Sequence, residues 1–180
     1  LSEDVPTVDE VRPNKPFFYF SAGCNYKEKA KGWAAEMADL INTHNGGNMR
    51  IAIDRMAYEG IAAIQAHGFE IFDGFELMEN AREIKSDGEI ALMKHAIDVC
   101  ELGMKAMHEA MEPGMTENAL WSKLHAKNIE LGGEWIETRL LSSGQRTNPW
   151  FRECSMRVIE EGEMVSFDTD LIGPYGYCAD

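Results

Sequence analysis

EPGMTENALWSKLHAKNIELGGEW, residues 112–135, decides how the second half of the chain folds. Its Pro-Gly pair at 113–114 ends any helix that reaches it, because proline lacks a backbone N–H and glycine readily adopts positive φ angles. Thr116 is a favoured N-cap residue, so a new helix is expected from there to about Leu131. The Gly-Gly pair at 132–133 then ends that helix. The stretch therefore predicts a helix that follows another helix after a short break.

A long helix is predicted upstream, and it begins at a capping box formed by Ser86 and Glu89. In such a box the serine hydroxyl and the glutamate carboxylate each accept a backbone N–H of the first turn. Apolar residues recur along this helix at helical spacing, so one face is expected to pack on the core. The predicted core face consists of Ile90, Met93, Ile97, Cys100, Met104, Met107 and Met111. We place a domain boundary near residue 80, between domains 1–80 and 81–180.

Short apolar runs alternate with helical patterns before that boundary. FFYFS (17–21), MRIAID (49–54) and FEIFDG (69–74) are typical of strands. A helix is expected before the NGG sequence at 45–47, and a second helix over 57–66. This alternation favours an α/β unit with a parallel sheet.

The charge and cysteine content exclude several kinds of partner. The chain has 17 basic and 31 acidic residues, a net charge of −14, which repels nucleic-acid phosphates and anionic lipid head groups. No apolar run is long enough to span a bilayer, and the N-terminus lacks a signal-peptide pattern. The four cysteines are far apart and form no CxxC pair, which indicates reduced thiols. We therefore expect a cytoplasmic protein that binds neither nucleic acid nor membrane.

Three aspartates crowd the C-terminal stretch SFDTDLIGPYGYCAD, residues 166–180. Side chains two apart in a strand share a face, so Asp168 and Asp170 are expected to point the same way. A hairpin centred near Pro174 would set position 168 opposite Asp180. Converged carboxylates repel one another unless protons or a cation offset the charge, and oxygen ligands suit divalent and trivalent first-row metals. A solvated acidic strand face would have the same spacing, so both interpretations stay open on spacing alone.

The residues around the aspartates carry a resemblance to a known family. Residues 112–135, SSGQRTNP (142–149) and EEGEMVSFDTDLIGPYGYCAD (160–180) resemble the catalytic domain of the creatinase/prolidase metallopeptidase superfamily, which has the pita-bread fold. REIKSDGEIALMKHA (82–96) resembles the linker into that domain. The resemblance implies an α/β N-terminal creatinase-like segment in 1–80. The first half of an α+β pita-bread catalytic domain would follow it.

Two departures from the peptidase pattern matter for function. The resemblance implies that Asp168 and Asp180 correspond to two metal-ligating aspartates of the superfamily. Peptidase members carry glycine after the first of these, where this chain has Asp170 and one extra residue before Asp180. Peptidase members also carry a histidine in the loop after the glycine-containing strand, where this chain offers Trp150 or Phe151. Loss of that histidine weakens the case for peptide cleavage.

Both departures, together with FFYFSAGCNYKEKAKGW (17–33), resemble the dimethylsulfoniopropionate lyase branch of the superfamily, found in marine bacteria. The resemblance implies β-elimination of this small zwitterionic substrate to dimethyl sulfide, acrylate and a proton. It also implies Asp168, Asp170 and Asp180 as metal ligands, with iron as the metal, in one or two ions. An aromatic face suits a sulfonium cation, and Trp150 is the candidate for that contact.

The superfamily's remaining metal ligands, one histidine and two glutamates, come from the second half of the catalytic domain. The resemblance therefore implies that this chain is a fragment, inactive by itself, with the general base in the absent half. A homodimer is also implied, since the family is mostly homodimeric. Two alternatives stay open. One is a Xaa-Pro peptidase or creatinase-like hydrolase of the same fold, and the other is a non-catalytic pita-bread protein-binding module, which would be expected to lose metal aspartates.

Overall fold

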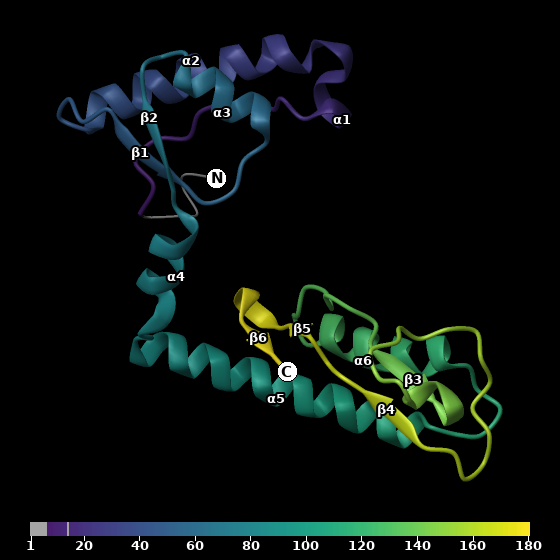
Figure 1. Cartoon of the computed structure of the whole chain (residues 1–180). Helices are drawn as coiled ribbons and strands as arrows, with labels where there is room; N and C mark the ends of the chain where they lie inside the picture. The colour runs from purple at the N-terminus through teal and green to yellow at the C-terminus, as the bar shows by residue number, and fades with distance from the viewer. Residues whose placement is uncertain (1–6, 14) are drawn as a thin grey trace. The chain divides into compact units, whose positions relative to one another are not determined.

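A computed structural model describes residues 7–13 and 15–180 (Figure 1). The chain divides into two compact units, Leu1–Ile84 and Lys85–Asp180, and each has a hydrophobic cluster of its own. The division lies near the boundary expected at residue 80. The assignment of 1–80 and 81–180 to two domains of the superfamily stays a prediction. None of the described helices combines the length and the apolar character that a membrane span requires.

The first unit contains a parallel strand pair and two packed helices. Its elements are α1 (Tyr19–Ala22), η1 (Gly23–Asn25), α2 (Tyr26–His44), β1 (Arg50–Ile53), α3 (Tyr58–Gln65), β2 (Glu70–Asp73) and α4 (Phe75–Glu83). Strands β1 and β2 pair in parallel, with Arg50 opposite Glu70 and Ile53 opposite Asp73. The buried residues of its cluster are Ala34, Ala38, Ile64 and Phe69. The α/β unit with a parallel pair is therefore confirmed for the strands predicted at 49–54 and 69–74.

The strand predicted at 17–21 is wrong. Phe17 is buried and its ring lies 4.9 Å from that of Trp33, but the residues after it turn into helix α1. The backbone N–H groups of Ser21 and Ala22 both donate to the carbonyl of Phe18, which is a helical turn. A strand needs a hydrogen-bonded neighbour, and none pairs with this segment among the described residues. An apolar run in the sequence does not show whether the segment forms a strand or merely buries one aromatic side chain.

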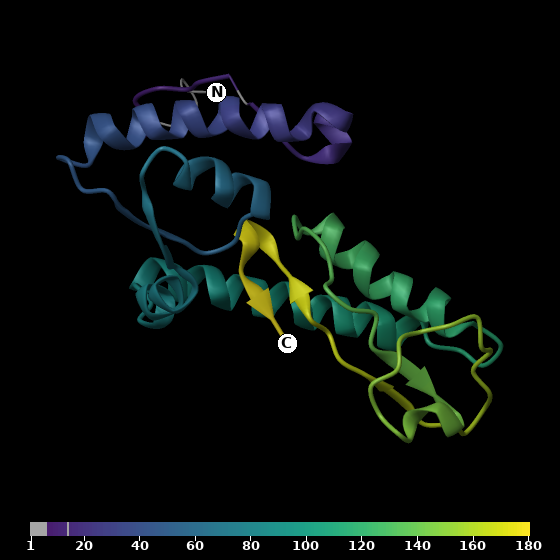
Figure 2. The ribbon, with the colours of Figure 1, turned by 45° about the horizontal axis from the view of Figure 1, so that its top comes forward.

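The second unit combines two long helices with two short antiparallel strand pairs. Its elements are α5 (Asp87–Ala110), α6 (Glu117–Glu130), β3 (Leu141–Ser143), η2 (Gly144–Thr147), β4 (Val165–Phe167), β5 (Leu171–Ile172), η3 (Pro174–Gly176) and β6 (Cys178–Ala179). Strand β3 pairs with β4, and β5 pairs with β6. Figures 1 and 2 both show the β5–β6 hairpin beside helix α5.

The predicted helix ends of this unit are confirmed. The Ser86 hydroxyl accepts the Glu89 N–H at 3.3 Å, and the Glu89 carboxylate accepts the Ser86 N–H at 2.8 Å, so the capping box forms. The Thr116 hydroxyl accepts the N–H of Ala119 at 3.1 Å and caps α6. Gly132 follows α6 with φ +88°, a conformation that glycine adopts without strain.

The core face predicted for α5 is only partly right, because Ile90, Ile97 and Met111 are exposed. The buried residues of this helix are Ala96, Val99, Cys100, Gly103 and Met107. A Cβ atom at Gly103 would come within 2.8 Å of Leu124, so α6 crosses α5 where side chains are small. The predicted core face contained no glycine or alanine, although small residues allow two helices to approach each other most closely.

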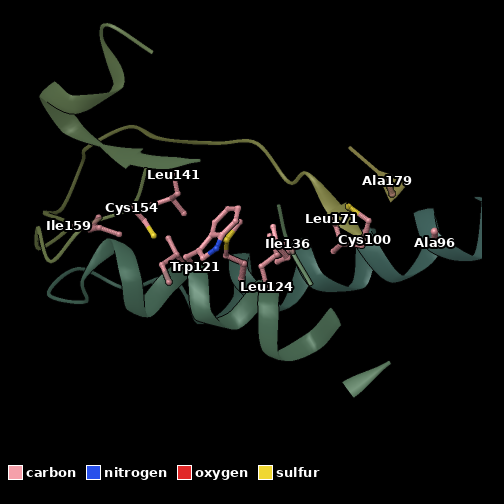
Figure 3. Packing of buried hydrophobic residues seen from close by; sticks show 12 residues of the cluster. Ala96, Cys100, Trp121, Leu124, Ile136, Leu141, Cys154, Ile159, Leu171 and Ala179 are labelled. Carbon is pink, nitrogen blue, oxygen red and sulfur yellow. The ribbon is translucent and has the colours of Figure 1, made fainter. Parts of the chain in front are cut away.

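The hydrophobic cluster of the second unit connects these helices to the strands (Figure 3). Its buried residues are Ala96, Cys100, Met107, Leu120, Trp121, Leu124, Ile136, Leu141, Cys154, Ile159, Leu171 and Ala179. Leu171 and Ala179 come from the paired strands β5 and β6, and Cys100 and Ala96 come from α5. Burial of these strand residues holds the hairpin that carries the last aspartate against α5.

Gly173 packs closely against α5. A Cβ atom at position 173 would lie 2.9 Å from the Cβ of Ala96 and 3.1 Å from the carbonyl oxygen of Tyr177. Neither neighbour can move easily, because Ala96 is fully buried and the Tyr177 oxygen accepts the N–H of Gly173 at 2.9 Å. Any side chain here would push the hairpin away from the helix.

Substitution of Gly173 by alanine is expected to lower the free energy of unfolding by about 1–3 kcal/mol, as overpacking does at tight core positions. Urea unfolding of the purified protein measures this. Gly88→Ala is the matched control: its Cβ would meet only the Ser86 hydroxyl oxygen, at 3.9 Å, and stability should stay unchanged or rise by up to about 1 kcal/mol. Equal stabilities for the two variants would contradict the close packing of hairpin and helix.

Candidate metal centre

Three carboxylates meet next to the β5–β6 hairpin. One oxygen from each of Asp168, Asp170 and Asp180 lies within 4.8 Å of the other two. Asp168 and Asp170 are half-buried, and Asp180 is exposed. No other group of histidine, cysteine, aspartate or glutamate in residues 7–13 and 15–180 brings three such atoms together. The structure thus joins the three predicted aspartates in one place, and metal binding by them stays a prediction.

The backbone brings the aspartates together in a different way from the one predicted. Strand β4 ends at Phe167, and Asp170 has φ +38°, so residues 166–170 are not one continuous strand. The β5–β6 register pairs Leu171 with Ala179, which places Asp170, not Asp168, at the position opposite Asp180. The hairpin register predicted around Pro174 is therefore wrong. The turn at Asp170 brings both Asp168 and Asp170 toward Asp180.

Thr169 anchors this turn to the core. Its side chain is buried, and its hydroxyl accepts the thiol of Cys100 on α5 at 3.5 Å. The two aspartates on either side of it carry their carboxylates to the cluster instead. On the backbone, the N–H of Asp168 donates to the carbonyl of Leu140 at 2.9 Å. Thr169 and the backbone at Leu140 therefore hold residues 168–170 in place, while the side chains of Asp168 and Asp170 remain free to meet in the cluster.

The carboxylates affect one another's charge. A hydrogen bond with Asp180, then burial, then the negative charges of Asp180 and Asp170 raise the pKa of Asp168 from its ordinary 3.8 to about 6. Among the described residues, no lysine or arginine forms an ion pair with any of the three. The cluster therefore holds like charges that only protons or a bound cation can offset.

The donor set fits a hard or borderline divalent cation. Carboxylate oxygens are the ligands that magnesium, manganese and iron accept, and their negative charge complements that of the ion. Three carboxylates supply only part of the four to six ligands that such ions need. If they bind a metal, the three carboxylates would therefore supply only one side of its site.

Trp150, predicted to contact substrate, lies in the loop after η2 and is exposed. Within the described part of the chain, its ring stacks on no other aromatic ring. Phe151, beside it, is more exposed and has φ +80°. The substrate role of Trp150 stays a prediction.

Glu117 is a buried residue that sequence reasoning missed. Its carboxylate is fully buried and accepts the Ser143 N–H and hydroxyl, both at 2.8 Å. It also accepts the Ser155 N–H at 3.0 Å, the Ser155 hydroxyl at 2.6 Å, and the guanidinium of Arg146. Burial alone would raise the pKa of Glu117, but the bonds from Ser155, Ser143 and Arg146 outweigh it and lower the pKa. A glutamate in the first turn of a helix is ordinarily exposed, so the sequence carried no signal for this role.

Comparisons with known proteins agree with this architecture. Residues 91–180 match metallopeptidase family M24. The chain is 49% identical over 185 residues to a protein of Roseovarius nubinhibens named "Dimethylsulfoniopropionate lyase DddP", covering all of this chain and 42% of that protein. It is 45% identical to a protein of the same name from Roseobacter denitrificans, again along its whole length, covering 41% of that protein. The chain thus spans less than half the length of these curated relatives.

A solved structure shows the fold. The Xaa-Pro dipeptidase from Bacillus anthracis superposes with a TM-score of 0.71 at 23% identity, over 82% of this chain and 42% of that chain. At this identity the likeness concerns the fold alone. Together with the family match, it confirms the creatinase-like and pita-bread fold expected from the sequence.

Removal of the charge at Asp168 should stabilise the metal-free protein. Because the folded-state pKa of Asp168 is raised, this residue destabilises the fold progressively as pH rises from about 4 to about 6, and fully above that. Thermal unfolding in chelator should therefore give Asp168→Asn a higher midpoint than wild type at pH 7, with the difference vanishing below about pH 4.

The control for this comparison is Glu112→Gln, which removes an exposed carboxylate from the turn before α6. Its midpoint should follow that of wild type across the pH range. A midpoint of Asp168→Asn equal to wild type at pH 7 would show that the three carboxylates do not repel one another.

Proposed function

Because the chain belongs to metallopeptidase family M24, we propose that the full-length protein uses this fold as a metal-dependent lyase that cleaves dimethylsulfoniopropionate to dimethyl sulfide and acrylate. The observation that carries the proposal is the similarity of the whole chain to two proteins named dimethylsulfoniopropionate lyase. The three-carboxylate cluster lies within the region that matches the family. A small zwitterion with a carboxylate is a substrate that a metal at this cluster could bind.

The proposed metal ligands from this chain are Asp168, Asp170 and Asp180. A metallopeptidase family fold implies divalent metal ions, and we propose iron, in one or two ions, as the metal in this protein. Manganese, cobalt and zinc also suit carboxylate-rich sites, so metal analysis of the purified protein decides among them. The three residues would hold the ion on one side, and the remaining ligands would come from outside this chain.

The proposed reaction is a β-elimination. A base removes the proton from the carbon next to the substrate carboxylate, the C–H electron pair forms the new double bond, and the C–S bond breaks with its pair leaving on dimethyl sulfide. A metal bound to the carboxylate supplies Lewis acidity that makes this C–H more acidic. The three aspartates serve as ligands, and a ligating carboxylate is a weak base. We therefore assign the general base to a part of the protein that this chain does not cover.

Trp150 is proposed to face the sulfonium end of the substrate. A dimethylsulfonium group has no hydrogen-bond donor and carries positive charge, so the electron-rich face of an indole attracts it. The exposed ring, which stacks on no other aromatic ring among the described residues, is available for such a contact. The resemblance implies that this loop corresponds to the one in which peptidases of the fold carry a histidine.

We also propose a homodimer in the cytoplasm. The dimer follows from the superfamily resemblance. All four cysteines are free, two of them exposed, which suits a reducing compartment.

Headspace analysis of the purified full-length protein incubated with dimethylsulfoniopropionate tests the activity. We expect release of dimethyl sulfide that stops with a chelator and returns with ferrous iron. Asp168→Ala should lose bound metal and more than about 99% of the activity, because a ligand of the ion is gone, while its circular dichroism stays unchanged. Glu112→Gln, outside the cluster, should keep full activity.

Other outcomes separate the alternatives. A folded, metal-loaded protein that releases no dimethyl sulfide but hydrolyses a Xaa-Pro dipeptide would be a peptidase of the same family. A folded protein that retains no metal and has neither activity would support the protein-binding module.

Replacement of Trp150 tests the aromatic contact. Trp150→Ala should raise KM by about tenfold with a smaller change in kcat, since a cation–π contact contributes about 1–2 kcal/mol to binding. Trp150→Phe should retain most of the affinity, because its ring still offers a π face. If alanine and phenylalanine raise KM equally, or neither does, the sulfonium is recognised elsewhere.

A further inference from the structure

A short stretch of chain between α6 and β3 fixes the backbone of two of the three aspartates. The N–H of Glu137 donates to the carbonyl of Asp170 at 3.0 Å, and the carbonyl of Leu140 accepts the N–H of Asp168 at 2.9 Å. These residues precede strand β3, which pairs with β4 directly before Asp168. The stretch 137–140 therefore runs alongside the metal-binding turn and sets its backbone position.

Within this stretch, Thr138 is the residue whose side chain reaches the cluster. Its hydroxyl donates to Oδ2 of Asp170 at 2.5 Å, and both residues are half-buried. The next side chain, Arg139, instead pairs with Glu153 at 2.9 Å. Thr138 thus faces the aspartates, and Arg139 does not.

This hydrogen bond restrains a side chain that would otherwise turn freely. The carboxylate torsion of an aspartate is broad, so backbone position alone does not decide where its oxygens point. A hydroxyl that donates to an ionised carboxylate at this distance makes a strong, charge-assisted hydrogen bond. Asp170 also has φ +38°, an uncommon backbone conformation for a residue other than glycine. Asp170 is therefore held both by the backbone of Glu137 and by the side chain of Thr138.

We propose that Thr138 is a positioning residue for the metal site. Its hydroxyl holds one oxygen of Asp170 and so directs the carboxylate toward Asp168 and Asp180. Hydrogen-bonded partners of ligating carboxylates commonly tune metal affinity in this way. The proposal rests on the metal site of the proposed function and extends it to a residue that does not ligate the ion.

Metal titration of the full-length protein tests this directly. Apo-protein is titrated with Mn²⁺ by calorimetry, without substrate, in wild type, Thr138→Val and Thr138→Ser. Valine has the shape of threonine without the hydroxyl, so affinity should fall by about 10–100-fold. Serine keeps the hydroxyl, and its affinity should stay within about threefold of wild type. Thermal unfolding in chelator checks that all three proteins are folded at the temperature of the titration.

A double-mutant cycle with Asp170→Ala shows whether Thr138 acts through Asp170. Once the carboxylate is absent, Thr138→Val should have no further effect on Mn²⁺ affinity. An equal loss from Thr138→Val with and without Asp170 would overturn the proposal, and so would wild-type affinity in Thr138→Val alone. A wild-type protein that binds no Mn²⁺ or iron would overturn the metal site itself and this inference with it. Metal binding without lyase activity would contradict the proposed function and leave the role of Thr138 intact.

Discussion

The convergence of three carboxylates is the constraint that the second unit of this protein has to accommodate. One oxygen from each lies within 4.8 Å of the other two, and no ion pair with a lysine or arginine offsets their charge among the described residues. Each one is restrained separately: Asp168 through the carbonyl of Leu140, Asp170 through Thr138, and Asp180 through the β5–β6 pairing. The hydrophobic cluster between the helices and the strands stabilises a fold that tolerates this charge.

A second acidic group in the same unit shows what a structural carboxylate looks like here. Glu117 is fully buried, yet two serines and an arginine satisfy its oxygens and its pKa is lowered. Asp168 has the opposite character, because neighbouring carboxylates raise its pKa to about 6. A buried carboxylate whose oxygens are all hydrogen-bonded serves packing and register. Clustered carboxylates without an ion-pair partner are instead suited to bind a cation. The contrast supports the assignment of the three aspartates, and not Glu117, to a metal site.

The predictions that succeeded rest on local chemistry. The capping box at Ser86 and the cap at Thr116 depend on hydrogen bonds within one helical turn, so residue types at fixed spacing suffice to predict them. The parallel strand pair followed from the alternation of strand and helix patterns. The strand expected at 17–21 failed because strand formation requires a partner far along the chain, and an apolar run does not show whether that partner exists.

The amino-acid sequence by itself determined the helix ends, the fold class and the identity of the three clustered aspartates. Residue type, spacing and resemblance to a superfamily are properties of the chain alone. Only the tertiary structure decided how those aspartates meet: the turn at Asp170, the hairpin register that sets Asp170 opposite Asp180, and the hydroxyl of Thr138 on Asp170. It also decided that α5 buries small residues such as Gly103 where α6 crosses it. These features depend on contacts between segments that are distant in the sequence. The energies of such contacts cannot be read from local sequence patterns.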